Sequence, residues 1–380
     1  MIHKNFRLIL VTAVVTLGVF FLLEKHILPG STAGAPAAKG VDLLSQVVRL
    51  IKNDYVEERD PVQTMEGAYK GLVNSLDPYS GYLDKDTAAK YFQRKEGRLN
   101  ETGLVLYKKG NSFSVIAAVL ENSPAEKKGL KVGDYLSAID GRSTLLMSLA
   151  EASLSLEDKG TAPVKVRVLR EADTLNLEIE RIQIAAGPFS YRGAEGTSGI
   201  LKINYLLPPC VAEIKKAVLP RLKSEKKPLV LDLTNCSEGT LDEARKLINL
   251  FLKANSIGYL EKRAGGKIGL ACLEKPELKD LPLVVWENQA TMGPAEIIVA
   301  VLQEFKRARA IGLPTVGATG EQEFFPLDGG SGLVLTSSIF HLNSGANLFG
   351  EGIKPDVKLE IGDQSQATFL KKTVGSGPSL

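Results

Sequence analysis

The sequence predicts an α/β protein with a central sheet, preceded by a smaller β-rich domain, a helical segment and one membrane segment. Three observations predict it. An unbroken apolar run occupies residues 8–23, and short β-rich runs follow between Glu101 and Ile184. After Pro188, strand-like runs such as "PLVLDLTN" alternate with helix-like runs such as "LDEARKLINLFL". A chain of 380 residues is too long for one ordinary core, and 44% hydrophobic residues fill more than one.

Composition excludes several classes of function. The formal net charge of +3 is spread along the chain, so no nucleic-acid partner is expected. Cys210, Cys236 and Cys272 lack the spacing of a zinc site and are too few and too scattered for a disulfide framework, although the sequence leaves room for one bridge. We interpret them as small buried apolar residues, and we expect no metal or cofactor.

The N-terminus is predicted to be a signal anchor over residues 1–28. The basic stretch "MIHKNFR" precedes the apolar run, and Lys4 and Arg7 place the N-terminus in the cytoplasm. The remainder then lies outside it, anchored at a bacterial-type inner membrane with a periplasmic or other extracytoplasmic location. Cleavage near the "AGA" at residues 33–35 is the alternative. Residues 29–40 are predicted to be a flexible tether.

Residues 41–95 are predicted to be helical. Leu43, Leu44 and Val47 begin an apolar pattern at helical spacing, and a second helix-like run covers residues 62–76. The stretch "SLDPYSGYL" closes this segment with a turn that Asp77 and Pro78 initiate.

Residues 101–184 resemble a PDZ domain. The resemblance is carried by "TGLVLY" at residues 102–107 and "ENSPAEKKGLKVGDYLSAIDGRS" at residues 121–143. It implies that the loop and strand at Gly103, Leu104, Val105 and Leu106 bind the terminal carboxylate of a peptide, which adds to the sheet as a further strand.

The whole order of segments resembles the carboxyl-terminal processing peptidases, also called tail-specific proteases. Within the core, "LVLDLTNCSEGTLDEA" matches the family segment LDLRNNPGGLLDEA, "GLPTVGATGEQ" matches GxxTxGKGxxQ, and "GIKPDV" matches GITPDV. The resemblance implies a ClpP/crotonase-like α/β core over residues 185–362, followed by a flexible tail at residues 363–380. It also implies serine-type proteolysis of protein C-termini or unfolded polypeptide.

The residues of that chemistry are altered. The family motif GSASASEI lies over "ATMGPAEI", which puts Gly293 at the serine position, and the lysine base falls on Ala318. One oxyanion donor falls on Pro294, which has no N–H. Gln322 and Gly239 are retained, but Gly239 now follows Glu238, whose carboxylate would oppose a developing negative charge. The sequence therefore predicts a natural pseudoenzyme in which Gly293 and Pro294 form an ordinary helix start.

Displaced chemistry is the alternative at the site. Thr291 and Thr319 are the candidate replacement nucleophiles, and both are also interpreted as turn or strand-edge hydroxyls. His341, the single histidine of the core, is interpreted as a packed or surface residue rather than a base.

Three hypotheses of function follow. The first is an anchored, inactive homologue that binds protein C-termini or unfolded tails through its PDZ domain, as an adaptor or scaffold. The second is an active endopeptidase with displaced residues. The third is a structural protein that forms homo-oligomers or pairs with an active relative through the helical segment.

Overall fold

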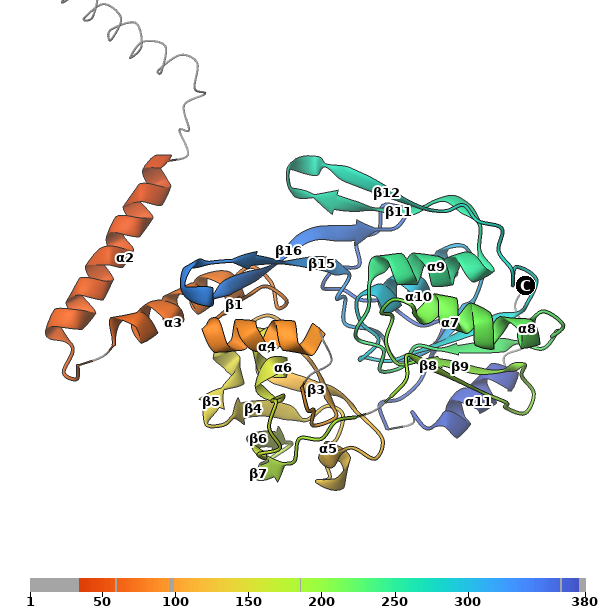
Figure 1. The fold of residues 1–380 in the computed structure, drawn as a ribbon, viewed down its shortest axis with the longest axis horizontal. Coiled ribbons are helices and arrows are strands. Elements are labelled where there is room, and N and C mark those ends of the chain that lie inside the picture. The colour runs from red at the N-terminus through yellow and green to blue at the C-terminus, as the bar shows by residue number, and fades with distance from the viewer. Residues whose placement is uncertain (1–33, 59, 96–98, 185, 363, 376–380) are drawn as a thin grey trace, which may run out of the picture. The chain divides into compact units, whose positions relative to one another are not determined.

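The computed structural model describes residues 34–58, 60–95, 99–184, 186–362 and 364–375 (Figure 1). The chain divides into two compact units, Met1–Ala68 and Tyr69–Leu380. The first unit contains helix α2 (Gly34–Asp54) and the start of α3 (Pro61–Asn74). Helix α2 begins inside the tether predicted over residues 29–40, so that prediction is wrong from residue 34 onward. Three alanines among residues 34–38 explain the difference, because alanine is the best helix former.

The anchor predicted over residues 1–28 lies outside the described residues. Among the helices that the structure does describe, none combines the length and apolar content needed to cross a membrane.

The PDZ-like domain is an antiparallel sheet with the strand order β2-β3-β4-β6-β7, with β5 paired to β4. Its strands are β2 (Leu104–Tyr107), β3 (Ser114–Val119), β4 (Tyr135–Ile139), β5 (Arg142–Ser143), β6 (Val164–Arg170) and β7 (Asp173–Ile179). Its helices are α5 (Pro124–Lys127), the 3-10 turn η1 (Thr144–Leu146) and α6 (Leu149–Ser155). Helix α6 begins where the Ser148 hydroxyl accepts a hydrogen bond from the Glu151 amide at 3.2 Å.

The central sheet of the C-terminal part has the strand order β17-β14-β13-β10-β9-β8. All its pairs are parallel except β8 with β9. The strands are β8 (Phe189–Arg192), β9 (Gly199–Ile203), β10 (Leu229–Asp232), β13 (Leu283–Glu287), β14 (Arg309–Gly312) and β17 (Val357–Lys358). Parallel strands covered on both faces are continuous apolar runs, which is why "PLVLDL" and "LPLVVW" could be recognised as strands.

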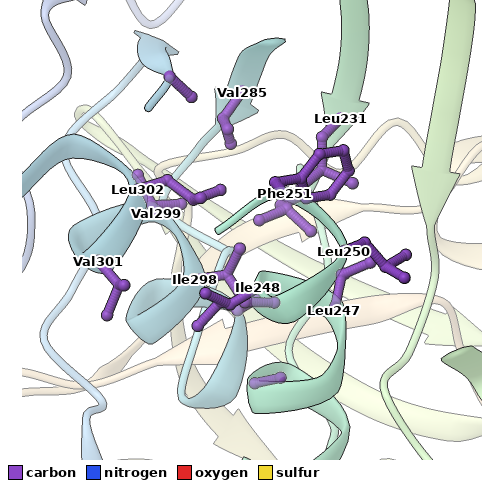
Figure 2. Packing of buried hydrophobic residues seen from close by; sticks show 14 of the residues in the cluster. Leu231, Leu247, Ile248, Leu250, Phe251, Val285, Ile298, Val299, Val301 and Leu302 are labelled. Carbon is purple, nitrogen blue, oxygen red and sulfur yellow. The ribbon is translucent and has the colours of Figure 1, made fainter. Parts of the chain in front are cut away.

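Helices cover one face of this sheet and form the main core. They are α7 (Cys210–Ala217), α8 (Leu219–Leu222), α9 (Leu241–Phe251) and α10 (Pro294–Glu304). Leu231 and Val285 point from the sheet toward Ile248 and Phe251 of α9 and Ile298 of α10 (Figure 2). The three cysteines are free and buried, as the sequence predicts.

The opposite face of the sheet is covered by α11 (Gln366–Gly375). Its Phe369 packs on Trp286, with ring centroids 4.9 Å apart, and the Trp286 indole N–H donates to the Thr373 hydroxyl at 3.0 Å. The flexible tail predicted from residue 363 is therefore wrong over α11, because burial of Phe369 against the sheet holds this helix in place.

A second antiparallel sheet has the strand order β1-β16-β11-β12, with β15 also paired to β16. Its strands are β1 (Gly81–Leu83), β11 (Ala254–Lys262), β12 (Lys267–Cys272), β15 (Gly320–Pro326) and β16 (Gly332–His341). The 3-10 turns η2 (Arg263–Gly265) and η3 (Asp328–Gly330) follow β11 and β15. Helix α4 (Lys85–Lys95) follows β1 and leads into the PDZ-like domain.

Candidate functional site

The turn over residues 288–293, called here the Gly293 turn, joins β13 to α10 at the centre of the sheet. Gly293 has φ 58° and ψ −122°, a backbone conformation that residues other than glycine rarely adopt. The expectation of an ordinary helix start is therefore wrong at this residue. The strand–turn–helix arrangement is of the kind that presents a nucleophile in hydrolases, and it persists here with a glycine at its apex.

A buried carboxylate holds the turn to the neighbouring loop. Glu296, in the first turn of α10, accepts hydrogen bonds from the amides of Gly293 at 3.0 Å, Gly317 at 2.7 Å and Ala318 at 2.6 Å. Burial raises the pKa of Glu296, and the three amide hydrogen bonds partly offset that shift. The sequence suggested Glu296 only as a favourable charge at a helix N-terminus; its contacts with the loop at Gly317 and Ala318 depend on the tertiary fold.

The position that matches the family's serine lies beside the backbone of the position that matches its lysine. A Cβ placed on Gly293 would lie 3.6 Å from the carbonyl oxygen of Ala318. Apart from the residues next to Gly293 in sequence, no other described residue has an atom within 4 Å of that Cβ. The backbone thus brings the two positions together. Neither residue carries a nucleophile or a base, so a Ser-Lys pair has no counterpart at these positions.

The oxyanion positions lie between the turn and the loop over residues 234–239, called here the Gly239 loop. Pro294 is the first residue of α10 and has no N–H to offer. The Met292 amide donates to the carbonyl oxygen of Cys236 at 3.0 Å, which ties the turn to the Gly239 loop. Gly239 has a packing reason to be glycine, because an added Cβ would lie 2.6 Å from the Leu206 Cβ.

Glu238 does not stand free beside these positions. Its carboxylate forms an ion pair with the guanidinium of Arg94, from α4. The charge that the sequence places next to the oxyanion position is therefore partly balanced by a residue more than a hundred positions earlier.

The remaining candidate residues are engaged in structural contacts. Thr291 is fully buried; its hydroxyl donates to the Leu233 carbonyl at 2.9 Å and accepts from the Asn288 amide at 2.9 Å. The exposed Gln322 donates its side-chain amide to the Gly320 carbonyl of its own strand at 2.9 Å. Thr319 is buried, and its hydroxyl has no hydrogen-bond partner within the described part of the chain, so no base activates it there. His341 stacks on Tyr259 with centroids 5.0 Å apart, and its Nε2 lies 3.0 Å from a Glu261 oxygen.

The PDZ-like domain packs directly on the Gly293 turn. One buried apolar cluster, called here the seam, joins strands β2 and β3 to the turn and to the loop at Val316. It contains Val105, Tyr107, Ala117, Ala118, Ala290, Met292, Val316 and Ala318. Apolar side chains thus surround the Gly293 turn, where a serine protease of this family would present its hydroxyl.

The predicted peptide-binding residues form the edge of the PDZ-like sheet. Gly103 has φ +84°, and a Cβ there would lie 2.2 Å from the Ser123 Cβ, so this loop position requires glycine. Strand β2, which contains Leu104, Val105 and Leu106, pairs on one side with β3 and is the edge strand in the described sheet. Leu106 packs with Ala152 of α6 in the domain core. An edge strand beside a helix is the arrangement that accepts a peptide by strand addition.

The sequence reasoning missed one buried acid near the turn. Glu287, the last residue of β13, is fully buried, and neither carboxylate oxygen has a hydrogen-bond partner among the described residues. Burial, with repulsion from Glu296 and Asp356, raises the pKa of Glu287 well above its ordinary value. The sequence did carry a signal for this buried acid, because a glutamate directly follows the apolar run "LPLVVW".

Comparison with known proteins shows which families the parts of this chain resemble. The profile of peptidase family S41 matches residues 199–359, that of a PDZ domain matches residues 115–170, and that of the activating protease CtpB N-terminal domain matches residues 24–87. Residues 199–359 match peptidase family S41, and the chain over most of its length is similar to C-terminal processing proteases. The family resemblance that the sequence motifs indicated is thereby confirmed, together with the PDZ domain.

Individual relatives agree with this assignment. The chain is 28% identical to the carboxy-terminal processing protease CtpA of Bacillus subtilis (strain 168), over 98% of this chain and 81% of that protein. It is 27% identical to a probable CtpA-like serine protease of Staphylococcus aureus (strain COL), over 96% of this chain and 73% of that protein. Its fold is similar to that of a photosystem II D1 C-terminal processing protease, with a TM-score of 0.70 at 20% identity, covering 89% of this chain and 97% of the other.

Proposed function

We propose that this S41 homologue binds the C-termini or unfolded tails of proteins through its PDZ domain and does not cleave them. The observation that carries the proposal is the pairing of Gly293 with Ala318. A Cβ placed on Gly293 would lie 3.6 Å from the backbone oxygen of Ala318, and neither residue has a side chain that could act as nucleophile or base. Because the backbone geometry persists without its chemistry, the scaffold has a use that does not depend on hydrolysis.

Two further features support loss of catalysis. Pro294 removes an oxyanion donor, and loss of one such donor costs about 10²–10³ in rate. Thr291, the nearest hydroxyl in sequence, uses its hydroxyl in two hydrogen bonds inside the fold. An active enzyme with displaced residues would need an exposed and activated hydroxyl at the turn. Thr291 does not supply one, because it is buried and already hydrogen-bonded.

Binding is assigned to strand β2. Its edge position permits main-chain hydrogen bonds with an added strand, and the glycine at residue 103 shapes the loop that precedes it. The chain would act as an adaptor outside the cytoplasm, held at a bacterial-type membrane by residues 1–28. The basic and apolar pattern of that segment supports this location.

Fluorescence anisotropy with the full-length chain tests the proposal. Labelled peptides that end in an apolar residue are titrated with a free or an amidated C-terminus. We expect binding of the free acid and at least tenfold weaker binding of the amide. Leu104→Glu should weaken binding by a similar factor, because it places a carboxylate beside the peptide's own. The matched control, Thr174→Glu on the opposite edge strand β7, should bind as the parent does. Equal affinity for both peptides, or no binding of either, would refute the assignment.

A second candidate function is assembly, and a specific observation favours it. Helix α2 exposes a set of apolar side chains at helical spacing, with Leu43 61% and Leu50 62% exposed. Such a face is typical of a helix that packs against a partner. A second copy of this chain or an active relative would cover it. Light scattering should give a mass above that of one chain, and Leu43→Asp should reduce it; a monomeric parent would reject self-association.

A further inference from the structure

Arg94 of α4 connects two parts of the chain that are far apart in sequence. Its Nη1 lies 3.2 Å from Oε1 of Glu157, which follows α6 in the PDZ domain. Its Nη2 pairs with the carboxylate of Glu238 in the Gly239 loop. One guanidinium therefore joins the PDZ domain to the loop beside the Gly293 turn, at a place separate from the apolar seam.

A second basic residue of α4 supports the same corner of the PDZ domain. Lys90 donates to the backbone carbonyl of Glu157 and to the carboxylate of Asp158, both at 3.1 Å. Helix α4 thus holds this corner through two cationic side chains, of which only Arg94 also pairs with the Gly239 loop.

The charges around Arg94 do not balance. Glu157, Glu238 and Glu101 act on the same guanidinium, and the Glu157 side chain is only 9% exposed. Lys90 adds one cation, and it also pairs with Asp158. When every carboxyl group of this cluster is ionised, the buried carboxylate of Glu157 faces two others and shares one guanidinium with them.

We propose that the cluster of Arg94, Glu157, Glu238 and Glu101 is a pH-sensitive clasp that holds the PDZ domain on the Gly293 turn and loosens when Glu157 ionises. Below neutral pH, Glu157 is neutral and Arg94 keeps its pair with Glu238. Above neutral pH, the buried carboxylate is stabilised by moving into water, which separates the PDZ domain from the loop.

The pKa of Glu157 supports the position of this switch. Burial raises it to about 7, and repulsion from Glu101 and Glu238 adds to the shift, while Arg94 and Lys90 oppose it. A raised carboxyl pKa means that the closed arrangement binds its proton more tightly than the open one. Stability of the closed arrangement therefore falls as pH rises toward 7, and it levels off above that value. Between pH 6 and 8.5 the open fraction should rise about tenfold.

Cysteine protection measures the clasp without requiring peptide binding or proteolysis. Ala118→Cys places a thiol in the seam, where Ala118 is 1% exposed. Its rate of alkylation in the full-length chain is divided by that of an exposed reference, Lys109→Cys, at each pH. We expect protection to fall about tenfold from pH 6 to 8.5, with Cys210 of the main core staying unreactive. If Ala118→Cys disturbs packing, Met292→Cys on the other side of the seam gives the same readout.

Two variants decide the outcome. Glu157→Gln keeps the side chain neutral, so protection should vary less than twofold over this range. Glu178→Gln, an exposed acid on β7 whose carboxylate lies 3.9 Å from the Lys165 amine, should retain the full pH dependence. The proposal is overturned if the parent shows constant protection, or if Glu157→Gln loses protection as much as the parent does.

Discussion

The carboxylate of Glu296 accepts a hydrogen bond from the Gly293 amide at 3.0 Å, and the same carboxylate accepts hydrogen bonds from Gly317 and Ala318. A single buried acid therefore fixes the turn at the serine position against the loop at the lysine position. The close approach of Gly293 to Ala318 is thus maintained by the hydrogen bonds of one buried carboxylate.

Glu296→Gln should lower the free energy of unfolding by about 2–3 kcal/mol, because an amide offers one acceptor oxygen to three buried N–H groups. The loss is measured by denaturant unfolding followed through the fluorescence of Trp286, the single tryptophan of the chain. Glu304→Gln, at the half-buried other end of the same helix, serves as the matched control. Its carboxylate accepts hydrogen bonds from the exposed amides of Asn343 and Ser344, so the variant should lose less than about 1 kcal/mol. Equal losses in the two variants would contradict a special role for Glu296.

Thr291→Val should cost about 1–3 kcal/mol of stability, because it leaves the buried backbone N–H of Asn288 without its acceptor and removes one of the two donors to the Leu233 carbonyl, the other being the Cys236 amide. Thr291→Ser retains the hydroxyl and should lose about 1 kcal/mol for the missing methyl group. Both variants and the parent should resist labelling by a serine-directed acylating probe. Labelling of the parent that disappears in Thr291→Val would support displaced chemistry instead.

Glu287→Val should stabilise the protein, and more so at pH 8 than at pH 5. The folded state raises the pKa of Glu287, so its carboxyl group favours folding at low pH and this contribution is lost as pH rises above about 4. Unfolding of variant and parent is compared at each pH, which cancels the titration of other groups. Glu323→Val, an exposed position on β15, should show no such pH dependence. A pH-independent difference for Glu287→Val would contradict the prediction.

Phe369→Ala should lose about 3–5 kcal/mol, because it removes a buried ring from the face of the sheet that α11 covers. The emission of Trp286 should shift to longer wavelength as water reaches the indole. Lys371→Ala, on the same helix, should leave both stability and emission unchanged. An unshifted emission in Phe369→Ala would mean that α11 does not shield Trp286.

The sequence was sufficient for the family resemblance and for the presence of a PDZ domain and an α/β core. The order of the motifs indicated a PDZ domain followed by an α/β core, and both are matched by family models. The strands of the core could be recognised because buried parallel strands are continuous apolar runs. Gly293, Pro294 and Ala318 were assigned to the family's catalytic positions from the register of the motifs, and this assignment stays a prediction. The positive φ of Gly293 was not predicted, because a Gly-Pro pair also suits a relaxed turn, and only the fold decides between the two.

Other features depend on contacts between distant segments. The pairing of Glu238 with Arg94 and the packing of Ala118 on the Gly293 turn join residues separated by more than a hundred positions, so local patterns carry no sign of them. Helix α11 was missed because ten residues near a chain end, rich in polar side chains, resemble a tail. Phe369 and Thr373 hold the helix in place by contacting Trp286 on the face of the sheet that α11 covers.

The most direct test of binding without cleavage is one mass-spectrometric experiment on an unfolded protein substrate. The full-length chain is incubated with the substrate and recovered by affinity purification. The masses of the bound and the free substrate are then measured. We predict that intact substrate is recovered with the chain and that no new peptides form. A Gly293→Ser, Pro294→Ala, Ala318→Lys variant provides the comparison for restored chemistry. Cleavage by the unmodified chain that exceeds a substrate-only control would contradict the account.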